Sequence, residues 1–253
     1  MLNLASLSRG RPGDPVVVLL HGLAGSAREM LPTADALAGA GYFAVALDQR
    51  GHGRSTRRPD DLSRQAYVSD VVALINEVSP GAPVTLVGQS MGGHTAMLTA
   101  AWHPELVSRL VMLEAGVGGG ARAELGEWFA SWPTPFPSLE AAAAFLGPAP
   151  ITEAWLRDLE ERPDGFHPRF DPDIMQAAID AVTAEARWPE WSRITAPTLL
   201  VTGQNGTLAA AELTRMLDTR PAVTHRVIAD AAHDAHLEQP AAWLDILLAY
   251  LAT

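Results

Sequence analysis

The chain has 253 residues, of which 48% are hydrophobic and 19% are charged, an ordinary balance for a globular protein with a sizeable core. Its 18 lysines and arginines stand against 29 aspartates and glutamates, which gives a formal net charge of −11. Such an acidic surface repels nucleic-acid phosphates and anionic lipids, so we expect neither nucleic acid nor a membrane as a partner. The absence of cysteine excludes disulfides, thiolate metal sites and a cysteine nucleophile.

The N-terminal segment lacks the basic and apolar regions of a signal peptide. No apolar run approaches the roughly 20 residues that a membrane-spanning helix needs. We therefore expect a cytoplasmic protein, a monomer or homodimer, whose partner is a small-molecule substrate.

Short apolar runs alternate with helical patterns along the chain. The run at residues 15–20 is apolar throughout and bounded by turn residues, which is typical of a strand buried on both faces. Ser26 and Glu29 have the spacing of a capping box, which predicts a helix from Ser26 to about Gly39 or Gly41. Further strands are predicted at 42–47, 84–87, 109–113, 198–202 and 224–228, and helices at 62–78, 91–102, 208–217 and 241–251. This alternation predicts an α/β fold with a mostly parallel sheet covered on both faces.

A stretch of different texture, residues 117–192, interrupts the alternation. It contains three consecutive glycines, a proline-rich segment at 132–137 and short helical patterns. Because it is too long for a loop, we predict a helical cap inserted into a core made of residues 1–116 and 193–253. Five tryptophans fall in the insertion. We expect two of them, Trp128 and Trp132, to line the substrate pocket, and packing of the cap on the core is the alternative role.

The strongest chemical signal is the segment GQSMG at residues 88–92, which lies between a predicted strand and a predicted helix. The pattern GxSxG alone is weak, but this context predicts a nucleophile elbow. Glycines on both sides let the backbone turn sharply, so that the hydroxyl of Ser90 stands at the N-terminus of the helix. A plain tight turn is the structural alternative.

Attack on an acyl group places negative charge on the carbonyl oxygen, which two fixed backbone N–H groups can stabilise. The N–H of Met91 directly follows the candidate nucleophile, and the N–H of Leu23 lies in the loop after the first predicted strand. These two amides are our candidates for an oxyanion hole. We place His21 at the substrate pocket, where it shapes the turn rather than taking part in catalysis.

A histidine-containing segment, AHDAHLEQP at residues 232–240, follows the last predicted strand. A histidine at this place can reach over the edge of the sheet to Ser90. His233 and His236 compete for the role, and we favour His233 as the general base.

Four segments in this order resemble the α/β-hydrolase superfamily: HGLAGS at 21–26, DQRGHGRS at 48–55, GQSMGG at 88–93 and AAHDAHLEQP at 231–240. The resemblance covers essentially the whole chain. It implies a doubly wound, mostly parallel sheet, with no cofactor and no metal. It also maps the histidine base of the family onto His233, with Ala232 in place of the usual glycine.

The sequence departs from this family where the acid of the catalytic triad is usual. An aspartate commonly follows the strand predicted at 198–202, but residues 203–208 read GQNGTL and contain no acid. Some members carry the acid one strand earlier, a position that corresponds to Glu114. We expect a carboxylate oxygen of Glu114 within about 3.2 Å of His233 Nδ1, with the neutral Asn205 uninvolved. The structural alternative is that Glu114 holds the loop that follows it.

Together these residues predict a serine hydrolase that cleaves a small or medium apolar ester through an acyl-enzyme intermediate. Thioesters, lactones, amides and C–C bonds fit the same machinery. Two other classes compete on this fold. One is a cofactor-free oxidoreductase, either perhydrolase (haloperoxidase-like) or dioxygenase, and the other is a ligand-binding or signalling protein with residual hydrolase activity.

Overall fold

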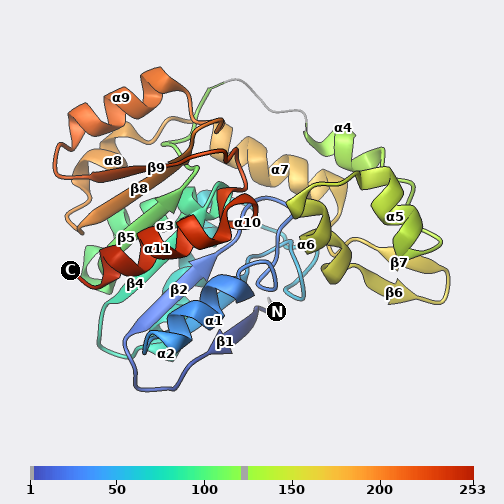
Figure 1. The fold of residues 1–253 in the computed structure, drawn as a ribbon, viewed down its shortest axis with the longest axis horizontal. Helices are drawn as coiled ribbons and strands as arrows, with labels where there is room; N and C mark the ends of the chain where they lie inside the picture. Colours follow the sequence, from blue (N-terminus) through green and yellow to red (C-terminus); the bar gives the residue numbers. More distant parts are fainter. Residues whose placement is uncertain (1–2, 121–124) are drawn as a thin grey trace.

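The computed structural model describes residues 3–120 and 125–253, and a seven-stranded sheet lies at its centre (Figure 1). The strand order is β1-β3-β2-β4-β5-β8-β9. All strands from β2 onward in this sheet pair in parallel, and β1 pairs antiparallel with β3 at one edge. The strands are β1 (Ala5–Arg9), β2 (Val16–Leu20), β3 (Phe43–Asp48), β4 (Val84–Gln89), β5 (Val107–Leu113), β8 (Thr198–Gly203) and β9 (Thr224–Ile228). The expected α/β fold is confirmed.

Helices cover both faces of the sheet because the central strands are apolar on both sides. In β2, Val18 and Leu20 face one core cluster, whereas Val17 and Leu19 face the other. The first cluster also contains residues of α2 (Arg64–Val78), α3 (Met91–Trp102), α8 (Trp188–Arg193) and α9 (Ala210–Thr219). The second contains residues of α1 (Leu31–Gly39) and α11 (Pro240–Leu251). The uninterrupted apolar runs of the sequence therefore mark strands that are buried on both sides.

The expected helix start at Ser26 is wrong, because α1 begins at Leu31. The preceding segment is committed to other contacts. The N–H of Ala27 donates to Asp48 Oδ1 at 2.6 Å, and Glu29 Oε1 lies 2.9 Å from His236 Nε2. Glu29 is therefore not free to cap the first turn, and Pro32 in that turn suits a later start.

The segment between β5 and α8 forms short helices and a hairpin, which gather on one side of the sheet core (Figure 1). The described elements are α4 (Leu125–Ala130), α5 (Leu139–Leu146), α6 (Pro150–Asp158), β6 (Glu160–Arg162), β7 (Gly165–His167) and α7 (Pro172–Thr183). Residues 121–124 of the expected insertion lie outside the described residues. Helix α8 lies almost entirely within the range expected for the insertion. Its Trp191, however, is fully buried in the first core cluster, so this helix packs against the sheet.

Across residues 3–120 and 125–253, we find no helix that combines the length and the apolar character needed to cross a membrane.

The packing of α3 on β2 gives a test of the elbow. A Cβ on Gly92 would lie 2.3 Å from the carbonyl oxygen of Leu20 and 2.4 Å from that of His21. We predict that Gly92→Ala lowers the free energy of unfolding by about 1–3 kcal/mol, because the backbone must shift to admit the methyl group. Gly39→Ala is the matched control, since nothing lies within 4 Å of its Cβ position at the end of α1. It should be neutral or stabilising by up to about 1 kcal/mol. Urea unfolding measures both, and equal losses would contradict the packing argument.

Candidate active site

Ser90 lies in the sharp turn between β4 and α3, with φ 51° and ψ −119°. A positive φ is costly for a residue other than glycine and persists only where the surroundings hold it. Its N–H donates to the carbonyl oxygen of Leu113 at 2.9 Å, which ties the turn to β5. A Cβ on Gly88 would lie 2.3 Å from the carbonyl oxygen of Gly92, so the chain crosses itself too closely for a side chain. The geometry matches the predicted elbow.

His233 stands beside Ser90, in the loop between β9 and the short helix α10 (Ala235–Glu238). Its Nε2 lies 2.9 Å from Ser90 Oγ. Its own carbonyl oxygen accepts a hydrogen bond from Gln89 Nε2 at 3.0 Å, so the residue before Ser90 also holds the histidine loop. The structure thus brings together the two residues to which the sequence assigns nucleophile and base.

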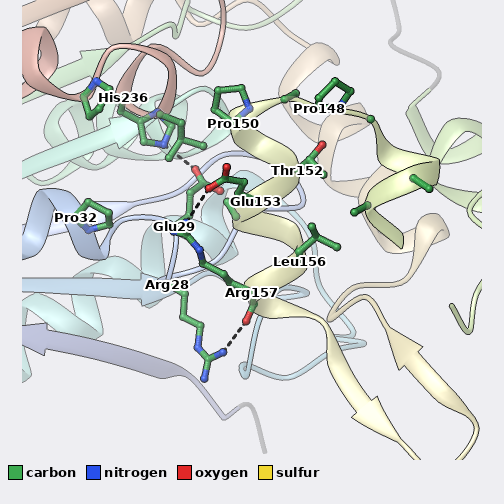
Figure 2. A pocket seen from close by; sticks show the side chains of 17 residues that line it. Arg28, Glu29, Pro32, Pro148, Pro150, Thr152, Glu153, Leu156, Arg157 and His236 are labelled. Carbon is green, nitrogen blue, oxygen red and sulfur yellow. Dashed lines mark hydrogen bonds and ion pairs between the residues drawn. The ribbon is translucent and has the colours of Figure 1, made fainter. Parts of the chain in front are cut away.

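His236, the competing histidine, is buried and faces a different partner. Its Nε2 lies 2.9 Å from Glu29 Oε1. Both residues belong to the wall of a cavity of about 780 Å³ that also includes Pro32, Leu156 and Leu237. Figure 2 shows Glu29 and His236 in contact within the wall of this cavity, and neither Ser90 nor His233 is among the residues that line it.

The carboxylate of Glu114 is buried in the loop that follows β8. Its Oε1 accepts the N–H of Gly203 and its Oε2 accepts the N–H of Thr207, both at 2.8 Å. A Cβ on Gly206 would lie 2.0 Å from Oε1, so only glycine at that position leaves room for the acid. The loop that lacks an acid of its own is therefore shaped around an acid from the neighbouring strand.

The contact between this carboxylate and the imidazole is longer than expected. Glu114 Oε2 lies 3.5 Å from His233 Nδ1, outside the 3.2 Å of a good hydrogen bond. The hydroxyl of Thr207 lies closer, with Oγ1 2.8 Å from His233 Nδ1 and 3.4 Å from Glu114 Oε2. Sequence reasoning missed Thr207, and the only available signal was a hydroxyl residue in the loop where the family's acid is usual. Asn205 is tied through its backbone N–H to Ala231, at 2.8 Å.

The electrostatics of the pair favour a charged carboxylate and a basic imidazole. Burial lowers the pKa of His233, but the contact with Glu114 and the negative charges of Asp234, Glu114 and Glu238 outweigh it and raise that pKa above 6.5. Burial also opposes ionisation of Glu114. Its contacts with His233 and with the two amide N–H groups outweigh this effect, so its pKa lies below the ordinary value.

The two candidate oxyanion donors lie in segments that converge on Ser90. Met91 is the first residue of α3, so its N–H has no acceptor within the helix and lies at the positive end of the helix dipole. The loop of Leu23 passes against the elbow, since a Cβ on Gly22 would lie 3.4 Å from Ser90 Cβ. The use of these two amides as an oxyanion hole stays a prediction.

The expected place of His21 at the substrate pocket is wrong, because its side chain is fully buried. Its Nδ1 lies 2.7 Å from the carbonyl oxygen of Gly22, and its Nε2 accepts the N–H of Gln49 at 3.0 Å. Gln49 Nε2 donates back to the carbonyl oxygen of His21 at 2.7 Å. The ring therefore holds the base of the Leu23 loop in place, which agrees with the expectation that His21 shapes this turn.

The two tryptophans that we expected at the substrate pocket have different environments. Trp132 is 4% exposed and packs among aromatic rings, with centroids 5.2 Å from Trp155 and 5.5 Å from Phe170. Trp128 is 45% exposed, although its ring lies against that of Trp132. The structure thus gives Trp132 a packing role, and the contact of either residue with substrate stays a prediction.

This difference predicts distinct outcomes for the two alanine variants. Trp132→Ala should lower the free energy of unfolding by about 3–5 kcal/mol, because it empties a buried aromatic site. Trp128→Ala should cost clearly less, because much of the ring is already in water. Thermal unfolding measures both. Equal losses would mean that Trp128 is as important to the aromatic cluster as Trp132.

The charges around His233 predict its titration. Because its pKa is raised, the ring should lose its proton at a pH above 6.5, and any step that needs the neutral ring should increase in rate as the pH rises through that value. Glu114→Gln removes a negative charge and should lower this pKa. NMR titration of the histidine ring protons, with His233→Ala for assignment, measures the shift. An unchanged pKa in Glu114→Gln would contradict the assignment.

Comparison with known proteins identifies the fold and the family of the chain. The family model described as "Serine aminopeptidase, S33" matches residues 11–240. The sn-1-specific diacylglycerol lipase ABHD11 of Mus musculus is 28% identical over 256 residues, which cover 94% of this chain and 81% of the relative. Esterase Rv0045c of Mycobacterium tuberculosis is 29% identical over 264 residues, which cover 94% and 83%.

A solved structure, that of E-2-(acetamidomethylene)succinate hydrolase, shares the fold at a TM-score of 0.90 and 22% identity, and the match covers 100% of this chain and 96% of the other. The relatives named above are a lipase and an esterase, and the family model spans most of the chain. The chain therefore belongs to the α/β-hydrolase superfamily, within the hydrolase family described as serine aminopeptidase S33.

Proposed function

We propose that this protein is a serine hydrolase that cleaves small or medium apolar esters through an acyl-enzyme intermediate. The observation that carries the proposal is the 2.9 Å contact between Ser90 Oγ and His233 Nε2, at an elbow that opens helix α3. A serine is a weak nucleophile unless a base within hydrogen-bond distance removes its proton.

The mechanism follows from the positions of these atoms. Ser90 Oγ attacks the ester carbonyl carbon while its proton moves to His233 Nε2. The N–H groups of Leu23 and Met91 donate to the oxygen that becomes negative. The imidazolium then gives the proton to the departing alcohol oxygen, which leaves an acyl group on Ser90. A water molecule then attacks the acyl group in the same way, and His233 takes its proton. This second step releases the carboxylic acid and restores the serine hydroxyl.

The surroundings favour an apolar substrate. The side chains of Leu23 and Met91 belong to an apolar cluster with Ala178 and Val182 of α7. The net charge of −11 also disfavours anionic substrates. The family description names an aminopeptidase, but the two relatives are named for lipase and esterase activity. Esters are therefore our first choice of substrate.

A panel of p-nitrophenyl esters of increasing acyl length, assayed with and without peroxide, tests the reaction class. Esterase activity predicts release of p-nitrophenol without peroxide. Peracid formation from peroxide and a short carboxylic acid, at rates above ester hydrolysis, would instead identify a perhydrolase. Tight ligand retention without product release would identify a binding protein.

Ser90→Ala should abolish turnover with the fold retained. In a well-measured serine hydrolase, loss of the nucleophile costs on the order of 10⁶ in kcat. A fluorophosphonate probe should label the unmodified protein at Ser90. Mass spectrometry of the labelled peptide would identify the site. Labelling that persists in Ser90→Ala would place the nucleophile elsewhere.

The two histidines supply a matched pair of variants for the same assay. His233→Ala should reduce kcat nearly as severely as Ser90→Ala, because the base is lost. His236→Ala should affect mainly stability, because it leaves the carboxylate of Glu29 buried without its partner. The opposite order of effects on kcat would reverse the assignment of the base.

A further inference from the structure

The hydroxyl of Thr207 occupies the space between the acid and the base of the candidate triad. Its Oγ1 is the nearer neighbour of His233 Nδ1, at 2.8 Å against 3.5 Å for Glu114 Oε2. Resting on the proposed serine mechanism, we infer that Thr207 is a positioning residue: its hydroxyl accepts the Nδ1–H of His233 and donates to Glu114.

The carboxylate cannot easily close the gap itself. Both of its oxygens accept backbone N–H groups at 2.8 Å, one from Gly203 and one from Thr207. A movement of Oε2 toward the imidazole would lengthen these charge-assisted hydrogen bonds, which are the strong ones. The acid is thus fixed too far from the ring for a good direct hydrogen bond. The threonine hydroxyl lies between them, at good hydrogen-bond distance from the imidazole, and its 3.4 Å contact with Glu114 Oε2 is the longer and weaker of the two.

The direction of the hydrogen bonds from His233 through Thr207 to Glu114 is set by the carboxylate at the end of the series. An ionised carboxylate only accepts, so the single hydroxyl hydrogen of Thr207 points to Glu114 Oε2, at 3.4 Å. The oxygen of the same hydroxyl then accepts Nδ1–H from His233. Nε2 is left with its lone pair toward Ser90, which is the tautomer that a base requires.

This series of hydrogen bonds orients the imidazole ring, but no proton moves along it. During attack, the proton of Ser90 moves to Nε2, Nδ1 keeps its hydrogen, and Thr207 keeps its own. The imidazolium that forms is stabilised by the hydroxyl at Nδ1 and, through it, by the charge of Glu114. Loss of the hydroxyl should therefore lower kcat and the apparent pKa of the base, and should leave KM almost unchanged.

Thr207 is exposed, so the test variant must also keep water away from Nδ1. Thr207→Val does so, because a methyl group takes the place of the hydroxyl, and the backbone N–H to Glu114 is retained. Thr207→Ser keeps the hydroxyl and loses only the methyl group. Thr202→Val is the matched control, because the hydroxyl of Thr202 contacts a histidine outside the site, His225, at 3.0 Å.

The experiment measures kcat and KM against pH for these variants, with a p-nitrophenyl ester as substrate. Thr207→Val should lower kcat by roughly 10- to 100-fold, the range expected for an unsatisfied hydrogen bond to a charged group. It should also shift the rise of kcat/KM to lower pH. Thr207→Ser should stay within about threefold of the unmodified protein, as should Thr202→Val. If Thr207→Val does not fold, Thr207→Ala at the same pH values replaces it, with a smaller loss of kcat expected because water can then reach Nδ1.

A double-mutant cycle with Glu114→Gln separates orientation from simple packing. If Thr207 acts through Glu114, then Thr207→Val should add much less to the loss in Glu114→Gln than it costs alone. Full additivity, an unchanged pH profile in Thr207→Val, or equal damage from valine and serine would each overturn the inference. Ser90→Ala keeps the two proposals apart. Turnover retained in Ser90→Ala defeats the serine mechanism, whereas a silent Thr207→Val with inactive Ser90→Ala defeats only the role of Thr207.

Discussion

A buried negative charge organises this site. The Glu114 side chain has no exposed surface, and an isolated carboxylate in such a place would be costly. The loop after β8 compensates for it with the N–H groups of Gly203 and Thr207. The carboxylate leaves no room for a side chain at Gly206, and its charge contributes, with those of Asp234 and Glu238, to the raised pKa of His233.

A second set of buried polar contacts supports the other side of Ser90. The Thr95 hydroxyl donates at 3.0 Å to either the carbonyl oxygen of Met91 or Gln49 Oε1, and Gln49 is hydrogen-bonded to His21. The guanidinium of Arg64, buried over the ring of Tyr67, also donates to Thr95. When Thr95 donates to Gln49, hydrogen bonds join the first turn of α3 to the base of the Leu23 loop, and they hold the two candidate oxyanion segments together.

The sequence was informative where one local pattern decides one local structure. The apolar runs of the parallel strands, the helix after Ser90 and the glycines of the elbow are all of this kind. It was less informative where the outcome depends on contacts between distant segments. The edge strand β1 has the sequence ASLSR, and its few apolar residues did not indicate a strand. The capping-box spacing at Ser26 does not mark a helix start, because Ala27 and Glu29 make contacts with residues far along the chain.

The same distinction holds within the site. Ser90, His233 and Glu114 could be assigned from motifs and from the end of a buried strand, and the structure places all three together. Thr207 could not, because the need for a hydroxyl there arises only from how far the fixed carboxylate of Glu114 stands from His233 Nδ1. A distance of this kind is a property of three loops at once, and no single segment encodes it.

The space taken by Glu114 also constrains how such a site can change over time. Any side chain at position 206 would collide with the carboxylate, with Cβ 2.6 Å or less from both of its oxygens. An aspartate introduced there while Glu114 is present would therefore meet both a steric clash and the repulsion of the Glu114 carboxylate. Position 206 lies in the segment 203–208, where the acid of the family is usual. An acid at this position could replace Glu114 by one substitution at a time only through an intermediate that is either crowded or without an acid. In sequence families that contain both arrangements, positions 114 and 206 should therefore vary together.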